Sequence, residues 1–105
     1  MLNRIAVLSA VLIASVAALA QTQEVRGTAT DSMCGRKHML KNATPAQCTR
    51  ECIKAGSDFA LAVGDKLYIM KGDEAQMDKF AGANVVVRGD VHGTTIDVKQ
   101  IKPAM

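Results

Sequence analysis

The pattern of apolar and polar positions predicts strands in the chain after residue 20. Side chains that alternate between apolar and polar are typical of a strand with one buried face, and short apolar runs between turn residues are typical of buried strands. Five segments have these patterns: 24–31, 59–63, 66–71, 84–91 and 94–101. Short turns, Gly64-Asp65 and His92-Gly93, separate the second segment from the third and the fourth from the fifth. Each of these two pairs is therefore expected to form a hairpin.

Two segments between the strands predict helices instead. Thr44-Pro45-Ala46-Gln47 is typical of a helix start, because Thr caps the first turn, Pro suits the first helical position and Gln completes a capping box. This helix is expected to end at Gly56. Asp73 is expected to cap a second, shorter helix that ends at Gly82.

The order of these elements predicts a mainly β fold, a small five-stranded OB-fold-like barrel. One short helix falls between strands 3 and 4, and a Cys-containing loop-helix insertion, residues 32–57, falls between strands 1 and 2. In OB-folds the loop between strands 1 and 2 helps to build the binding rim. An open antiparallel sheet with one covering helix is the alternative architecture.

The first twenty residues have the pattern of a secretory signal peptide. Arg4 supplies a positive charge, residues 5–17 are almost entirely apolar, and Ala18-Leu19-Ala20 supplies the small residues of a cleavage site. We therefore expect cleavage after Ala20, a single domain over residues 21–105, and a periplasmic or secreted location. An uncleaved membrane anchor is the alternative. No later segment is apolar enough to predict a membrane span.

Charge changes this picture because it is concentrated in the predicted insertion. The chain carries 13 Lys and Arg against 10 Asp and Glu, a net charge of +3. Glu51 is the one carboxylate of residues 32–57, which hold five cations: Arg36, Lys37, Lys41, Arg50 and Lys54. Cations near a thiol lower its pKa and favour the thiolate that metals bind. The cysteines of the insertion are therefore expected to ionise readily.

The insertion contains the three cysteines of the chain and one of its two histidines. Their spacing is Cys34-x3-His38-x9-Cys48-x3-Cys52, and positions four apart share one face of a helix, so Cys48 and Cys52 are expected to point the same way. Three thiolates and one imidazole suit Zn²⁺, and thiolates also suit Cu(I) because they are soft ligands. We therefore predict a zinc or copper site with Cys34, His38, Cys48 and Cys52 as ligands.

The same residues are open to other chemistry. Two cysteines pair by default in an oxidising compartment, and the favoured pair is Cys34 with either Cys48 or Cys52, which leaves one thiol over. A disulfide-stapled structural or protein-interaction domain is thus one alternative, and a thiol-redox protein is another. His92 would join the site if its turn lay on the same rim, although an ordinary hairpin-loop histidine is the favoured interpretation.

Two classes of function are poorly supported by the sequence. Hydrolytic catalysis lacks a placed serine, histidine and carboxylate set and a glycine-rich phosphate loop, so no enzymatic activity is expected. Aromatic residues make up 3% of the chain, which is too few for the stacking platforms of single-strand binders. We therefore expect no nucleic-acid partner, and the expected partners are a metal ion or another protein.

The stretch GTATDSMCGRKHM, residues 27–39, resembles a family of small exported bacterial proteins when it is taken together with Cys48-x3-Cys52-x3-Gly56 and residues 59–68. The family has a D-S-M-C-G-x-K-H signature, paired downstream cysteines and an OB-like β-domain. The resemblance covers essentially the whole mature chain, and residues 31–38 are its specific part. It implies the same domain boundaries and the same four site residues, but no reaction. The sequence thus predicts an exported, non-enzymatic binding domain.

Overall fold

The computed structural model of the protein describes residues 22–35 and 42–104. The predicted signal peptide and His38 lie outside these residues. Seven elements follow one another along the chain: β1 (Thr22–Asp31), α1 (Pro45–Lys54), β2 (Phe59–Val63), β3 (Lys66–Lys71), α2 (Glu74–Asp78), β4 (Asn84–His92) and β5 (Thr95–Pro103). Within the described ranges, none of the helices has the length and apolar character that crossing a membrane requires.

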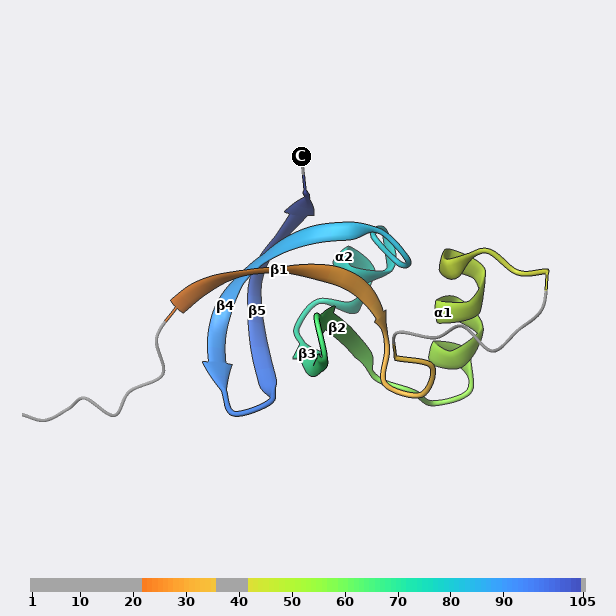
Figure 1. Cartoon of the computed structure of the whole chain (residues 1–105), viewed down its shortest axis with the longest axis horizontal. Helices are drawn as coiled ribbons and strands as arrows, with labels where there is room; N and C mark the ends of the chain where they lie inside the picture. The colour runs from red at the N-terminus through yellow and green to blue at the C-terminus, as the bar shows by residue number, and fades with distance from the viewer. Residues whose placement is uncertain (1–21, 36–41, 105) are drawn as a thin grey trace, which may run out of the picture.

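The five strands form one sheet that closes in a ring in the order β1-β2-β3-β5-β4 (Figure 1). Neighbouring strands are antiparallel except for β3 and β5, which pair in parallel through Ile69–Lys71 and Thr95–Asp97. The two hairpins, β2–β3 and β4–β5, are joined on one side by β1, which pairs with β2 and with β4. The parallel pairing of β3 with β5 joins them on the other side and so closes the ring. The prediction of a mainly β, five-stranded fold with a short helix between the third and fourth strands is confirmed, and the alternative of an open sheet is wrong.

Strand β1 belongs to both halves of the ring. Its first part pairs with β4 from Thr22 to Thr28, and its last part pairs with β2 from Thr28 to Asp31. Gly27 lies at this crossover, and a Cβ there would collide with the Ala62 carbonyl oxygen. Glycine is therefore required where β1 bends from one partner to the other. The bend carries the end of β1 to the side of the barrel on which α1 lies (Figure 1).

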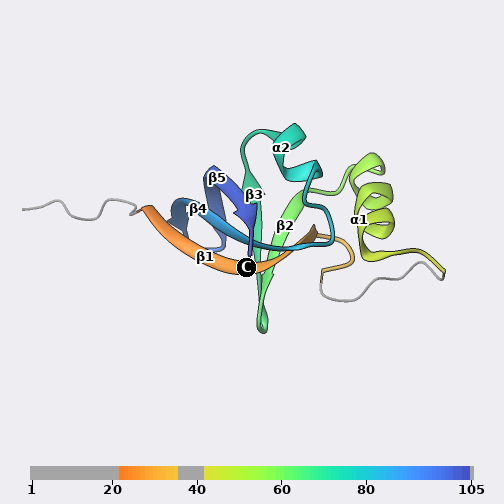
Figure 2. The same ribbon diagram turned by 90° about the horizontal axis from the view of Figure 1, so that it is seen from above.

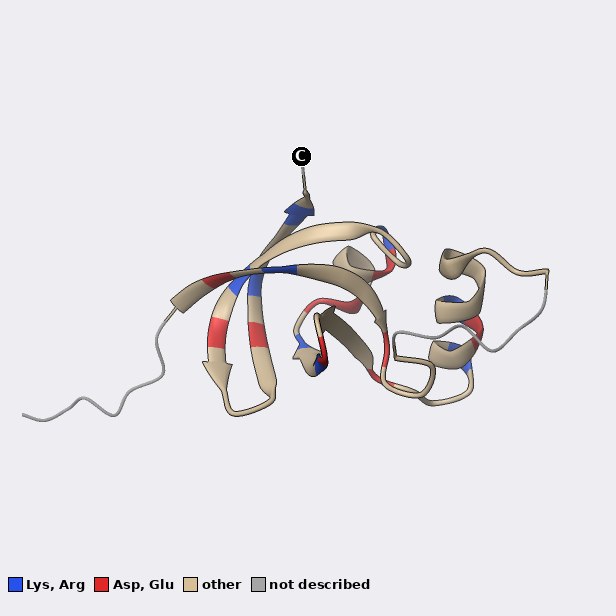
Figure 3. Ribbon diagram, in the orientation of Figure 1, with Lys and Arg blue, Asp and Glu red and all other residues tan. Residues whose placement is uncertain are grey.

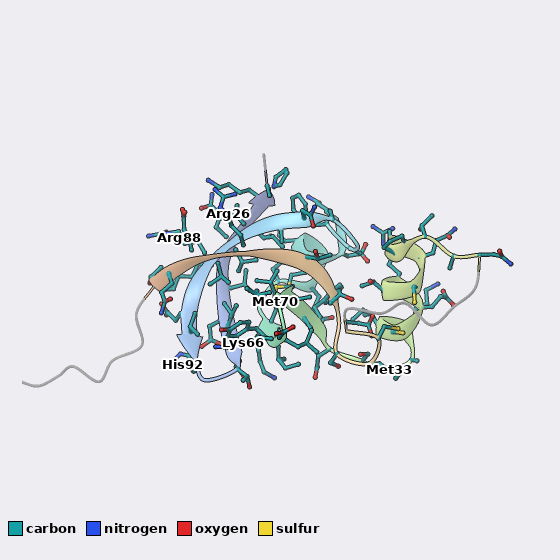
Figure 4. The ribbon with its side chains drawn as sticks, in the orientation of Figure 1. Arg26, Met33, Lys66, Met70, Arg88 and His92 are labelled. Atoms are coloured by element: carbon teal, nitrogen blue, oxygen red, sulfur yellow. The ribbon has the colours of Figure 1, made fainter. Side chains whose placement is uncertain are left out.

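The interior of the ring is filled by buried apolar side chains from all five strands and from α2. Met70 lies inside the barrel in Figure 4, and Met77 reaches the same core from α2. The buried members are Ala29, Phe59, Leu61, Met70, Met77, Val85, Val87, Ile96 and Ile101. The strands supply alternate residues to this core, as the period of two predicts.

Helix α1 lies outside the ring, beside the turn that follows β1 (Figures 1 and 2). It begins as predicted: the Thr44 hydroxyl accepts the Gln47 backbone N–H at 3.1 Å, and the Gln47 side chain accepts the Thr44 N–H at 2.8 Å. Ile53 is partly buried and packs against the barrel core. The cysteines of this helix lie in a separate cluster, described below.

Helix α2 is shorter than the sequence predicts. Asp73 caps it by accepting the backbone N–H groups of Ala75 and Gln76, but the helix ends at Asp78 instead of continuing to Gly82. The Gly82 N–H donates to the Ala29 carbonyl at 2.8 Å. The chain thus leaves the helix early because its backbone pairs with β1, a contact that no local pattern shows.

Candidate metal centre

Three cysteine side chains meet between the turn after β1 and the inner face of α1. The Cys34 Sγ atom lies 3.0 Å from Cys52 Sγ and 3.4 Å from Cys48 Sγ, and all three sulfurs lie within 4.8 Å of one another. The exposed fractions of the residues are 9% for Cys34, 0% for Cys48 and 8% for Cys52. They form a small buried cluster of their own, apart from the barrel core.

The backbone of the turn places the Cys34 sulfur at this point. Asp31 Oδ2 accepts the N–H groups of Met33 at 2.9 Å and Cys34 at 2.8 Å. The Gly35 N–H donates to the Asp31 carbonyl at 2.9 Å, and Gly35 has φ +58°, a left-handed conformation that glycine adopts at low cost. Asp31 and Gly35 therefore fold the four-residue turn that carries the thiol.

Helix α1 supplies the other two sulfurs from one face. Cys48 and Cys52 are one helical turn apart, so their side chains lie on the same side, as the spacing predicts. The helix is held to the rest of the protein by Arg50, which donates to the Asp78 carbonyl at 2.7 Å and forms an ion pair with the Asp78 carboxylate at 3.2 Å. Gly82 lies directly against the backbone of Pro45 and Ala46 at the start of the helix.

A set of serine contacts closes the insertion at its base. Ser32 and Ser57 approach each other with 2.9 Å between their hydroxyl oxygens. The Ser32 N–H donates to the Asp58 carbonyl at 2.8 Å, and the Ser57 N–H donates to the Cys52 carbonyl at 3.0 Å. The turn that carries Cys34 and the end of the helix that carries Cys52 are thus joined independently of the sulfurs.

The pKa of at least one thiol in the cluster differs from the value that the sequence predicts. The pKa of Cys52 is raised from 9.0 to about 12 by its hydrogen bond with Cys34, then by burial, and then by the nearby Asp31 carboxylate. The prediction that the basic insertion lowers thiol pKa values is therefore wrong for Cys52. Two of the five cations have other partners, since Arg50 pairs with Asp78 and Lys54 with Glu51. Figure 3 shows both signs of charge side by side on α1.

The distances in the cluster are compatible with a bound metal ion. No disulfide joins the described cysteines, and the closest sulfurs are well beyond the roughly 2.05 Å of an S–S bond. Thiolates bound tetrahedrally to Zn²⁺ at about 2.3 Å have their sulfurs about 3.8 Å apart. The Cys34 sulfur need only move away from the Cys48 and Cys52 sulfurs by about 1 Å or less to reach this separation. The described residues thus bring together three of the four predicted ligands, and His38 lies outside them.

His92 does not join this site. Figure 4 shows it at the β4–β5 turn, at the opposite end of the molecule from α1 and from Met33 in the turn after β1. Its Nε2 atom lies 3.1 Å from Asp97 Oδ2, and its side chain is exposed. The interpretation of His92 as an ordinary hairpin-loop histidine is confirmed, and its possible membership of the metal site is wrong.

Asp31 is the buried residue beside the cysteines that sequence reasoning did not single out. It is fully buried beside the thiols, although a carboxylate at the end of a strand would ordinarily face water. Its position three residues before Cys34 is the one local signal, because an aspartate in that place often accepts backbone N–H groups two or three residues ahead. That signal predicts a turn and not a buried charge.

No family model, no curated protein and no solved structure matches the chain. The resemblance to small exported bacterial proteins with the D-S-M-C-G-x-K-H signature therefore stays a prediction.

Proposed function

We propose that this protein is an exported, non-enzymatic binding domain that holds a zinc or copper ion through Cys34, Cys48 and Cys52. The observation that carries the proposal is the convergence of three buried sulfurs from two separate elements. Thiolates bind both Zn²⁺ and Cu(I), and a structural zinc site takes four such donors in a closed arrangement. His38, the fourth ligand expected from the spacing, lies in the same insertion.

A bound metal ion would help to stabilise the position of the insertion. The buried cluster between the turn and α1 consists of the three cysteines. A protonated cysteine thiol packs as a small apolar group, so three of them add little burial energy to the contacts that Arg50 and Ile53 make for the ten helical residues. A metal ion bound by three thiolates would contribute several kcal/mol, on the scale of structural zinc sites, which contribute about 10 kcal/mol or more.

The raised pKa of Cys52 makes ion capture and proton release one event. With a pKa of about 12 the thiol keeps its proton at neutral pH, and the ion must displace that proton to form a bond. Arg50 and Lys54 are already paired with Asp78 and Glu51, so the other three basic residues of the insertion would balance the negative charge of the thiolates.

Native mass spectrometry of the reduced, mature protein tests the proposal. We expect one ion for each chain, which is lost when the protein is denatured, and three titratable thiols after chelation. Cys48→Ser should lose the ion, while His92→Gln should keep it, because His92 is an equally ordinary metal donor at the far end of the molecule. A wild-type protein with three titratable thiols that takes up neither Zn²⁺ nor Cu(I) would contradict the proposal.

The second candidate is a disulfide between Cys34 and Cys52, with Cys48 left over. It is favoured by the shorter of the two sulfur separations from Cys34, 3.0 Å against 3.4 Å. Such a bond would staple the turn to α1 and leave a stapled interaction domain or a thiol-redox protein. The two candidates differ in mass, since a disulfide removes about two mass units and adds no metal.

Export and cleavage are tested by the same sample. The sequence pattern of residues 1–20 supports a signal peptide. If the proposal is correct, the intact mass of protein taken from the periplasm or medium corresponds to a chain that begins at Gln21. A chain that begins at Met1 and stays with the membrane would support the anchor instead.

A further inference from the structure

We propose that Asp31 supplies the fourth donor of the metal centre, through Oδ1, and that this oxygen ligand makes the site select Zn²⁺ over Cu(I). The inference rests on the proposed function, because it assigns a ligand to the same centre. It differs from the sequence-based prediction, which gives the fourth place to His38.

The two oxygens of the Asp31 carboxylate have unequal surroundings. Oδ2 accepts three hydrogen bonds, from the N–H groups of Met33 and Cys34 and from the Ser57 hydroxyl at 2.9, 2.8 and 3.3 Å. Oδ1 is buried and accepts no hydrogen bond from an N–H or O–H group of the residues that the structure describes. The remaining neighbour of the carboxylate is the Cys52 thiol, which is a weak donor. A buried carboxylate oxygen without a strong donor is costly, because it has lost water and gained no comparable hydrogen bond in return. The fold therefore retains a buried carboxylate oxygen that a cation would satisfy.

The position of this carboxylate connects it to the sulfurs. Asp31 is the last residue of β1, pairs with Phe59 of β2, and is itself 0% exposed. The Cys34 backbone N–H holds the carboxylate beside the cluster, because it donates to Oδ2 at 2.8 Å. The three sulfurs lie within 4.8 Å of one another and Asp31 does not belong to that set, so Oδ1 would have to move toward the sulfurs to share an ion with them. A cation held by the sulfurs would attract Oδ1 toward itself.

The hydrogen bonds to Oδ2 are those that a metal-binding carboxylate needs. Residues that ligate metals are in turn held by neighbouring groups that orient them. Here the backbone N–H of Cys34 does so, which means that one ligand orients another. If Oδ1 binds the ion while Oδ2 keeps its three donors, the turn and the centre form as one unit.

An oxygen donor distinguishes between the two candidate ions. Zn²⁺ is a borderline ion that accepts carboxylate oxygen at about 2.0–2.2 Å beside sulfur in a tetrahedral site. Cu(I) is soft, and thiolates are its preferred ligands. The carboxylate should therefore contribute to Zn²⁺ binding and contribute little to Cu(I) binding.

Competition with chelators of known affinity, on reduced mature protein, tests this assignment with each ion separately. Asp31→Asn keeps an acceptor for the Met33 and Cys34 N–H groups and removes the charge. We expect it to weaken Zn²⁺ binding by about tenfold or more, the scale for loss of a metal-supporting group, and to leave Cu(I) binding within about threefold. The Co²⁺-substituted protein should change its visible spectrum in Asp31→Asn, because a ligand atom is replaced.

Two further variants separate a ligand from a structural residue. Ser57→Ala removes one of the three hydrogen bonds to Oδ2 and leaves Oδ1 in place, so it should weaken Zn²⁺ binding less than Asp31→Asn does and keep the Co²⁺ spectrum close to wild type. Asp31→Glu retains a carboxylate and should recover part of the Zn²⁺ affinity that Asp31→Asn loses. Cu(I) binding by each variant serves as the check that the thiol cluster is still assembled.

Three results would overturn the assignment. Asp31→Asn with unchanged Zn²⁺ affinity would do so, as would a loss of Zn²⁺ and Cu(I) binding to the same extent. A third is loss of Zn²⁺ binding in His38→Gln together with its retention in Asp31→Asn, which would give the fourth place to the histidine. Each of these leaves the proposed metal-binding function intact. A wild-type protein that binds neither ion would instead remove both proposals.

Discussion

The Cys34 sulfur lies 3.0 Å from the Cys52 sulfur, although the two residues are 18 positions apart in the sequence. One belongs to the turn that ends β1 and the other to α1 outside the barrel, so this contact joins the two parts of the insertion, as the Ser32–Ser57 contact also does. The main core of the ring includes neither residue. The cysteine cluster is therefore distinct from the barrel core, and the insertion is expected to respond more strongly than the ring to changes at the sulfurs.

Loss of the centre should loosen the insertion and spare the ring. The reference is the metal-loaded wild-type protein. Relative to it, Cys52→Ser, which removes a ligand, or chelation of the wild type is expected to increase amide hydrogen exchange across residues 42–57 by about tenfold or more, because bound metal contributes folding energy. Exchange in β4 and β5 should change little, since their pairing involves no cysteine. Equal loss of protection in both regions would show that the two cores unfold together.

Gly82 should be intolerant of a side chain for two reasons. Its φ is +80°, and a Cβ there would lie 2.5 Å from the Ala46 nitrogen at the start of α1. The conformation alone costs an L-residue about 1–2 kcal/mol, and the collision adds to it. We expect Gly82→Ala to lower the free energy of unfolding by more than about 2 kcal/mol, measured by denaturant titration.

Gly93 supplies the matched control for Gly82. It also has a positive φ, +61°, but nothing lies within 4 Å of a Cβ built on it. Gly93→Ala should therefore show the conformational cost without the collision. Equal losses in the two variants would mean that α1 does not rest on Gly82 in solution.

The capping box of α1 should contribute measurably to stability. Thr44 accepts the Gln47 N–H, and Thr44→Ala removes that acceptor. The expected loss is about 1 kcal/mol in the free energy of unfolding. Thr44→Ser is the control, because serine caps as well as threonine does. An alanine variant as stable as the serine variant would show that the helix is held by its packing alone.

The carboxyl of Asp90 should titrate below its ordinary value of 3.8. Its pKa is lowered mainly by the hydrogen bond from the Thr22 hydroxyl, at 2.6 Å, and also by Lys99. A carboxyl with a lowered folded-state pKa contributes stability above its unfolded pKa, and that contribution is lost as the pH falls through the folded value. In an NMR titration, Thr22→Val should move the Asp90 pKa back toward 3.8. An unchanged pKa would assign the shift to Lys99.

Much of the fold follows from local patterns. The alternation over residues 59–63 and 66–71 with a Gly-Asp turn between them predicts a hairpin, and the structure has β2 and β3 with those bounds. The Thr-Pro-Ala-Gln start of α1 is predicted equally well, because capping involves residues within one turn of each other. The end of α2 is predicted wrongly, since the chain turns there to pair Gly82 with Ala29 of a distant strand.

The candidate site was also predicted only in part, and again the local features are the ones that the sequence predicts. By itself, the sequence determined which residue types are available, that Cys48 and Cys52 share a helical face, and that the insertion is basic. Only the tertiary structure decided that Cys34 meets them, that the Cys52 thiol has a raised pKa, and that His92 lies at the far end. It also decided that Asp31 is buried with one oxygen unpartnered. Helical spacing is a local property of the chain, whereas burial, desolvation and the distance between two sulfurs depend on which remote segments pack together.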